Sequence, residues 1–172
     1  MKKFLTAIIA VAMVLSAIAA MAYEEKAYTI TPKLAYSYQM NKDTRDLVDY
    51  TFGILVEGSM SNFPVGLEVG YLWGSKKTNG IKHNLDQFPI LATYKAAFTP
   101  DSPFYYDLGL GFSINKLKES GDSTRSCTSV AFKAMAGWEF AENFVAEAGY
   151  VNYGSVDSNA LHSLQINVGY SF

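Results

Sequence analysis

The amino-acid sequence predicts an all-β protein, an eight-stranded antiparallel up-and-down transmembrane β-barrel. Apolar and polar residues alternate in eight successive runs, which is the pattern of strands with two different faces. The polar faces are rich in glycine, which suits the crowded interior of a barrel of this size. The apolar faces carry most of their aromatic residues near the ends of the runs, where they would meet the two boundaries of a membrane.

The first 22 residues are predicted to be a cleavable signal peptide, and residues 23–172 to form the barrel. Lys2 and Lys3 precede an apolar stretch from Phe4 to about Ala19, and Ala20-Met21-Ala22 fits the small-x-small pattern of a cleavage site. The alternative is an N-terminal membrane anchor, against which the shortness of the apolar stretch argues.

Four alternating runs occupy the first half of the mature chain. The polar cluster Asn41–Asp46, a short turn at Met60–Phe63 and the polar loop Ser75–His83 separate them. Pro89 in the fourth run indicates a local irregularity, because proline cannot donate a hydrogen bond to a neighbouring strand. The runs are Tyr28–Met40, Val48–Gly58, Val65–Gly74 and, with an approximate start, Leu85–Ala97.

Four further runs follow the turn signal Thr99–Pro103. Lys116–Thr128 is the longest predicted loop, Ala141–Asn143 is a tight turn, and Gly154–Ala160 is the last loop. The corresponding strands are predicted at Phe104–Asn115, Val130–Phe140, Phe144–Val151 and Ser163–Phe172.

The connections between the runs predict the topology of the barrel. Each run has about the length that a tilted strand needs to cross a bilayer. Longer polar loops follow the first, third, fifth and seventh runs, and short turns follow the others, which predicts both chain ends on the short-turn side. A secreted β-sandwich is the alternative, but it would have to hide all of these aromatic rings inside about 150 residues.

The inner face is predicted to carry an ionic network, because an unpaired buried charge is costly. Lys95 should lie opposite Asp107 and form an ion pair with it, and Lys33 should lie one diagonal step from Glu57. Asp49 and Glu139 share this face, and acids outnumber lysines, so some acids near the ends must meet water. A polar plug is favoured over a gated pore because eight strands leave little free lumen. The network comprises Lys33, Glu57, Glu68, Lys95, Asp107, Lys133 and Glu147.

The C-terminal stretch Leu164–Phe172 resembles the terminal strand signal of bacterial outer-membrane barrels. Phe104–Phe112 and Gly137–Phe140 resemble the internal strands of the same proteins. The resemblance covers the mature chain and is to small barrels of the OmpX and OmpA membrane-domain type. It implies a location in the cell outer membrane, contact with its lipid, and recognition of the C-terminus by the barrel-assembly machinery. The residues of that signal are Ile166, Val168, Tyr170 and Phe172.

The residues give little sign of catalytic or cofactor chemistry. With 14 basic and 16 acidic residues and no basic run, nucleic acid is not an expected partner. No cluster has metal-ligand spacing, and no cofactor is predicted. The candidate catalytic pairs are His162 with Ser158 or Ser163, and His83 with Asp86. Adjacent residues on a strand point to opposite faces, which argues against His162 with Ser163; no catalytic residue is predicted.

Three functions therefore follow in order of preference. The first is a monomeric structural or surface-interaction scaffold with a polar, plugged interior, whose exposed loops meet an unidentified ligand. The second is transport of small solutes or apolar molecules, through the lumen or through a lateral opening near Pro89. The third is a lipid-modifying enzyme, the least favoured because the nucleophile and base pairs are weak. Cys127, the only cysteine, is assigned no role.

Overall fold

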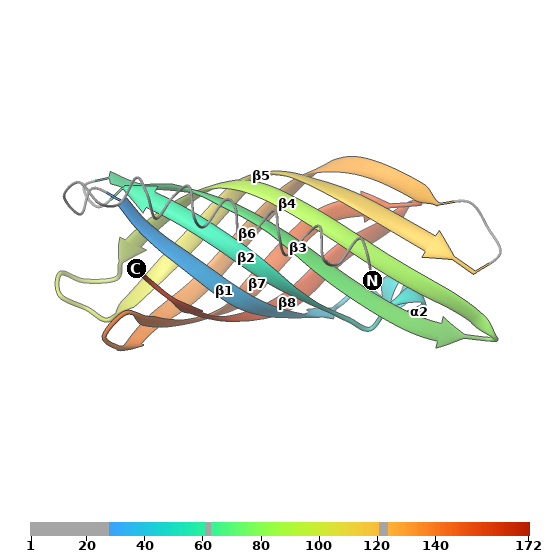
Figure 1. Cartoon of the computed structure of the whole chain (residues 1–172), viewed down its shortest axis with the longest axis horizontal. Coiled ribbons are helices and arrows are strands. Elements are labelled where there is room, and N and C mark those ends of the chain that lie inside the picture. The colour runs from blue at the N-terminus through green and yellow to red at the C-terminus, as the bar shows by residue number, and fades with distance from the viewer. Residues whose placement is uncertain (1–27, 61–62, 121–123) are drawn as a thin grey trace.

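The computed structural model describes residues 28–60, 63–120 and 124–172 (Figure 1). Eight strands pair antiparallel in the order of the chain, and β1 closes on β8, which confirms the predicted up-and-down barrel. The predicted signal peptide, residues 1–22, lies outside the described residues. Within the described ranges, no helix is both long enough and apolar enough to cross a membrane.

The barrel has two ends that differ in their connections. The turn end holds the start of β1, the C-terminus and the connections β2–β3, β4–β5 and β6–β7; the loop end holds the other four connections (Figure 1). The elements are β1 (Tyr28–Gln39), α2 (Lys42–Leu47), β2 (Tyr50–Met60), β3 (Phe63–Thr78), β4 (Ile81–Ala97), β5 (Phe104–Glu119), β6 (Arg125–Ala141), β7 (Phe144–Val156) and β8 (Asn159–Tyr170).

Along the strands the side chains alternate between the interior and the outer surface in the predicted phase; Val48, which the pattern had put on the outer face, lies before β2 and is buried inside. Leu34 is 68% exposed and points outward, whereas its neighbours Lys33 and Ala35 are buried. Aromatic rings pack against one another near both rims, for example Tyr71 on Phe88 toward the loop end. An apolar outer belt between aromatic rims is the surface that a membrane barrel presents to lipid.

The predicted loops at the loop end are mostly strand. β3 and β4 continue to Thr78 and Ile81, and only Asn79 and Gly80 connect them, with φ angles of 52° and 85° that suit a tight hairpin turn. The same correction applies to Lys116–Thr128, which the ends of β5 and β6 enter, and to Gly154–Ala160, where β7 and β8 leave only two residues between them. Polar residues on the outward face made these strand ends look like loops.

The predicted loop Asn41–Asp46 contains the short helix α2 rather than irregular chain. Asn41 caps it by accepting a hydrogen bond from the backbone N–H of Asp43 at 3.0 Å. The Thr44 hydroxyl donates to the carbonyl of Ala160 on β8 at 2.8 Å. Lys76 of β3 lies 2.9 Å from Asp49, just beyond the helix. These contacts hold α2 against the loop end.

The sequence predicted a polar interior, but only part of the interior is polar. Leu55, Leu72 and Leu91 are fully buried on the inner faces of β2, β3 and β4. With few exceptions, the apolar inner residues lie nearer the loop end than the charged residue of the same strand, so the barrel has a polar half and an apolar half. The apolar cluster comprises Ala35, Val48, Leu55, Leu72, Leu85, Leu91, Leu117, Ala131, Met135, Val151, Tyr153, Val156 and Leu161.

The predicted irregularity at Pro89 is present as a gap in the ladder between β3 and β4. Paired residues jump from Val69 and Ile90 to Leu72 and Gln87, so two positions on each strand are unpaired. Proline has no backbone N–H, so one hydrogen bond of the sheet cannot form there. The register is unchanged on both sides of the gap, and the barrel wall stays continuous in sequence order.

Candidate functional site: the ion cluster inside the barrel

Seven of the eight strands each place one charged side chain in the polar half of the lumen. The strand period of two turns every second residue inward, and closure of the sheet brings these inward residues to one place. We call this group the ion cluster. In the order β1 to β7 it consists of Lys33, Glu57, Glu68, Lys95, Asp107, Lys133 and Glu147.

Lys33 lies at the centre of the ion cluster. Its Nζ atom is 2.7 Å from Glu57, 3.1 Å from Glu68, 2.8 Å from Glu147 and 3.7 Å from Asp107. The side chain of Lys33 is completely buried, and those four carboxyls replace the water it has lost. A buried ammonium group is tolerated only with such partners. Lys33 therefore joins β1 to four other strands, β2, β3, β5 and β7, of which only β2 is its neighbour in the sheet.

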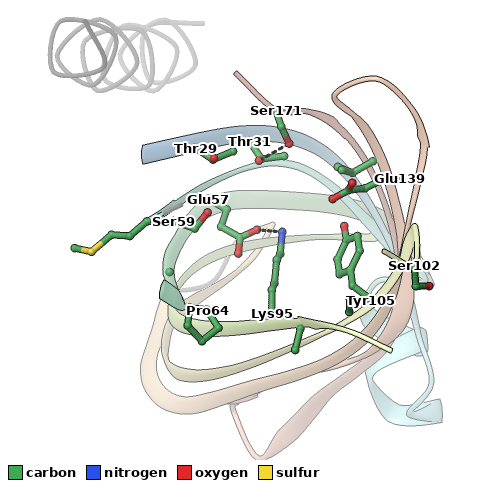
Figure 2. Close-up of a pocket in the computed structure, with 15 residues that line it drawn as sticks. Thr29, Thr31, Glu57, Ser59, Pro64, Lys95, Ser102, Tyr105, Glu139 and Ser171 are labelled. Atoms are coloured by element: carbon green, nitrogen blue, oxygen red, sulfur yellow. Dashed lines mark hydrogen bonds and ion pairs between the residues drawn. The ribbon is translucent and has the colours of Figure 1, made fainter. Parts of the chain in front are cut away.

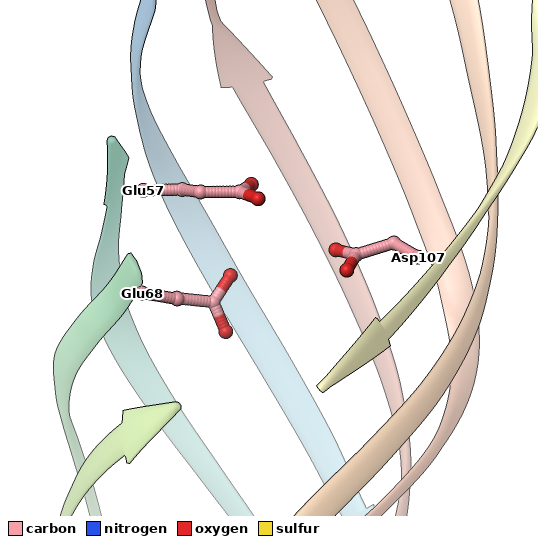
Figure 3. Close-up of side chains that lie close together, drawn as sticks. All are labelled: Glu57, Glu68 and Asp107. Atoms are coloured by element: carbon pink, nitrogen blue, oxygen red, sulfur yellow. The ribbon is translucent and has the colours of Figure 1, made fainter. Parts of the chain in front are cut away.

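Three acids of the cluster point toward one another from β2, β3 and β5 (Figure 3). Oxygen atoms of Glu57, Glu68 and Asp107 lie within 4.8 Å of each other, a spacing that also suits a metal ion. The ammonium groups of Lys33 and Lys133 already bond them: Lys133 lies 2.8 Å from Glu68 and 2.6 Å from Asp107. Linear spacing did not reveal this carboxylate array, because its members come from separate strands.

The predicted ion pair between Lys95 and Asp107 does not form, although the two residues lie opposite each other in the ladder. The Lys95 amine bonds Glu57 at 2.6 Å and lies 3.4 Å from Glu147. It also lies 5.2 Å from the centre of the Tyr105 ring. In so narrow a lumen a lysine side chain reaches across to another wall, and Asp107 is taken by Lys133.

Uncharged side chains complete the bonding of the cluster, and the sequence analysis had not assigned them to it. The Tyr105 hydroxyl donates to Glu147 at 3.0 Å, and the Asn167 amide of β8 donates to the same carboxyl at 2.9 Å. Thr93 donates to Glu57 at 2.9 Å. The sequence indicated only that these three residues lie on the inner faces of their strands, as the charged residues do.

The acids predicted near the rims lie outside the cluster. Glu139 is exposed at the turn end. Asp49 is half-buried at the loop end, where it pairs with Lys76. The cluster itself holds three lysines and four carboxyls, so its formal charge is close to neutral.

A vestibule of about 310 Å³ opens from the turn end to the ion cluster (Figure 2). Thr31, Ser59 and Tyr105 are among its lining residues, and Lys95 stands at its inner end, bonded to Glu57. The side chain of Lys95 is 25% exposed, whereas that of Lys33 is fully buried. Water therefore reaches the edge of the cluster from this end. From the loop end, the apolar cluster covers it.

The candidate catalytic residues do not come together. His83 points inward and lies 3.2 Å from Glu119, while Asp86 points outward and accepts a hydrogen bond from Tyr71. His162 contacts the hydroxyl of Tyr150 on the outer wall.

Ser163, next to His162, is fully buried in the interior. Ser158 lies in the turn between β7 and β8, with a φ angle of 64°. The strand geometry thus separates His83 from Asp86 and His162 from Ser163.

The residues of the predicted C-terminal signal lie on the outer wall, from the middle of β8 to the turn end. Ile166 and Val168 are about half exposed, and Phe172 is 75% exposed. The Phe172 ring packs against Tyr170 with 4.8 Å between centroids, and its backbone N–H bonds the carbonyl of Ile30. β8 ends at Tyr170. The last two residues lie beside β1, held there by the hydrogen bond from Phe172 to Ile30.

Comparison with known proteins places this geometry among small membrane barrels. A family model described as outer membrane protein beta-barrel domain matches residues 7–172. Neisserial surface protein A is 18% identical, with a TM-score of 0.57 over 85% of this chain and 97% of that one. The N-terminal β-barrel domain of Pseudomonas aeruginosa OprF is 16% identical, with a TM-score of 0.59 over 84% and 97%.

The Yersinia pestis outer membrane protein Ail is 18% identical, with a TM-score of 0.54 over 84% of this chain and 99% of that one. At these identities the likeness to solved structures shows the fold alone. Among curated proteins, no significant match to this chain is found.

Proposed function

This chain belongs to the outer membrane protein beta-barrel domain family and lies in the bacterial outer membrane, and on that basis we propose that it is a closed surface-interaction scaffold. The observation that carries the proposal is the filled interior. Leu55, Leu72 and Leu91 are wholly buried beside the ion cluster, so side chains occupy the path that a solute would take. The fold's rigid wall then serves to hold its loop end in place.

The unequal strand lengths support a role for the loop end. β3 to β6 have 16 or 17 residues, whereas β1, β2, β7 and β8 have 11 to 13. A tilted strand needs only about 9–11 residues to cross a bilayer. The extra length of β3 to β6 projects beyond the aromatic rim and forms a raised platform. We take this end to face the exterior, where a ligand would meet it.

The closed sheet also supports a monomer. β1 pairs with β8 as well as β2, so no strand edge is left to pair with a second copy. In biogenesis, the exposed C-terminal residue Phe172 is the proposed contact of the barrel-assembly machinery.

Single-channel recording in planar bilayers tests whether the barrel is closed. The folded protein is expected to give no unitary current. A steady ohmic current that disappears when Lys95 is replaced by methionine would overturn the closed scaffold, because it would place ion flow at the inner end of the vestibule.

Removal of residues 77–82, with Lys76 joined to His83 by Asn-Gly, tests the platform. The shortened protein is expected to keep the heat-modifiable migration of a folded barrel on a denaturing gel, since the removed tip makes few contacts with the interior. Loss of that migration would show that the hairpin is needed for folding rather than for surface contact.

A second candidate is passage of a small solute, which the vestibule favours because it brings water to Lys95. Substitutions that make a hole in the apolar cluster distinguish the closed scaffold from a transporter. If the barrel is a closed scaffold, Leu72→Ala and Leu91→Ala together are needed before vesicles become permeable to a small solute. If the natural protein is a transporter, the unaltered chain already makes them permeable.

A further inference from the structure

A groove of about 430 Å³ lies on the lipid-facing wall where β3, β4 and β5 meet. It opens at the gap in the ladder beside Pro89, and Val69, Ile90 and Ile114 give it apolar sides. Lys116 stands at its rim nearest the loop end. The groove is therefore an apolar hollow with a cation at one end, in a wall that faces lipid.

Beyond the groove toward the loop end, the outward faces of these strands carry a row of lysines. We call Lys77, Lys82, Lys116 and Lys118 the lysine row; all four are exposed. Lys77 lies directly opposite Lys82 in the ladder, an arrangement in which like charges repel. Among the described residues, none of the four forms an ion pair, so the row is complementary to an anion.

Among the residues that the structure describes, the one acid on this face is already engaged. Asp86 lies opposite Lys116 in the ladder but accepts a hydrogen bond from the Tyr71 hydroxyl at 2.6 Å. The amine of Lys116 instead lies 5.8 Å from the centre of the Phe88 ring. Tyr71 and Phe88 pack together at 4.6 Å and mark the membrane boundary, so the lysine row begins at the depth of lipid head groups.

From this juxtaposition we propose that the wall of β3 to β5 binds one phosphorylated glycolipid of the outer leaflet. An acyl chain lies in the groove beside Pro89, and the phosphate lies between the ammonium groups of Lys116 and Lys118. A soluble anion would use the lysines but not the apolar groove that Lys116 borders. The site goes beyond the scaffold role and depends on it only in that the loop end faces outward.

Native mass spectrometry of the full mature barrel in nonionic detergent tests the site, with bisphosphorylated lipid A as the probe. The double variant Lys116→Gln/Lys118→Gln is expected to bind lipid A about 25-fold more weakly, about five-fold for each lysine. Ile114→Trp, which fills the groove, is expected to weaken binding about ten-fold. Heat-modifiable migration on a gel confirms that each variant is folded.

Two matched variants separate the site from general effects of charge and bulk. Lys42→Gln removes an exposed lysine from α2 at the same end, and Leu110→Trp adds a ring to a lipid-facing position outside the groove. Both are expected to bind lipid A as the unaltered protein does. An equal loss with Lys42→Gln, or no loss with Ile114→Trp, would overturn the proposal.

Phosphatidylglycerol, offered as a second probe, tests which leaflet supplies the lipid. It is expected to bind at least about ten-fold more weakly than lipid A, because it has one phosphate for the lysine row. Tighter binding of phosphatidylglycerol would overturn the assignment to the outer leaflet. None of these results depends on conductance, so the lipid site and the closed scaffold stand or fall separately.

Discussion

The Nζ atom of Lys33 lies 2.8 Å from Oε1 of Glu147, although 114 residues separate them in the chain. The contact joins β1 to β7 through the interior, not through the sheet. It is one of the ion pairs of the ion cluster, to which every strand but β8 contributes a charged side chain. β8 contributes the amide of Asn167, which donates a hydrogen bond to Glu147.

Replacement of Lys33 by methionine is expected to destabilise the barrel by about 3–5 kcal/mol, because four buried carboxyls would lose their shared cation. The free energy of unfolding in urea, measured in lipid vesicles, checks this. Lys42→Met is the control, since Lys42 is exposed on α2. If both variants were equally stable, water would have to reach the centre of the cluster.

Replacement of Gly137 by alanine is expected to cost about 1–3 kcal/mol, because a Cβ at that position would overlap the Tyr105 ring. The ring cannot easily yield, since its hydroxyl is bonded to Glu147. Urea unfolding again supplies the measurement. Gly58→Ala is the matched change in open space, where nothing lies within 4 Å, and should be near neutral. Equal stability of the two variants would count against close packing at Tyr105.

Replacement of Gly80 by alanine is expected to loosen only the tip of the β3–β4 hairpin. Gly80 has a φ angle of 85°, which an L side chain adopts at a cost of about 1 kcal/mol. Hydrogen exchange should quicken at Thr78 and Ile81 and stay unchanged in the membrane-spanning part of β4. Faster exchange across the whole barrel would show that the tip is coupled to the interior.

Replacement of Phe172 by alanine is expected to lower the amount of barrel in the outer membrane several-fold while leaving refolding into detergent micelles almost unchanged. The side chain is 75% exposed and its ring packs on Tyr170, so its loss removes little buried area. Phe98→Ala is the control, because Phe98 is an exposed turn-end ring that packs on Tyr106 in the same manner. Similar membrane levels for both variants would contradict a recognition role for Phe172.

The alternation of side chains was enough to predict the barrel and the direction in which most strand residues point, though not that of Val48, which lies in the interior apolar cluster. It placed Lys33 and Glu57 within reach of one another because both positions follow from the register of a single hairpin. It failed for Lys95, whose partner is set by the width of the lumen and not by the strand opposite. A local pattern carries no information on which walls of a closed barrel face each other.

The strand ends and the apolar half of the interior were harder to predict for a different reason. Beyond the membrane the outward face of a strand is as polar as a loop, so Lys77 and Lys118 appeared to belong to connections. Leu72 and Leu91 did stand on the polar faces of their runs, which was a visible sign of the apolar cluster. Helix α2 is too short to show a helical period at all.

The distribution of the ion cluster over seven strands bears on how the protein enters its membrane. An open, partly paired sheet would present Lys33, Glu68 and Glu147 unneutralised, and hydrocarbon excludes such groups. Only when β1 meets β8 do the charges face one another and leave the wall between the aromatic rims apolar outward. Insertion is therefore expected to follow closure of the barrel, and partly assembled chains should stay at the aqueous interface. Once the closed barrel is inserted, separation of its strands would expose these charges to hydrocarbon, so unfolding should be slow.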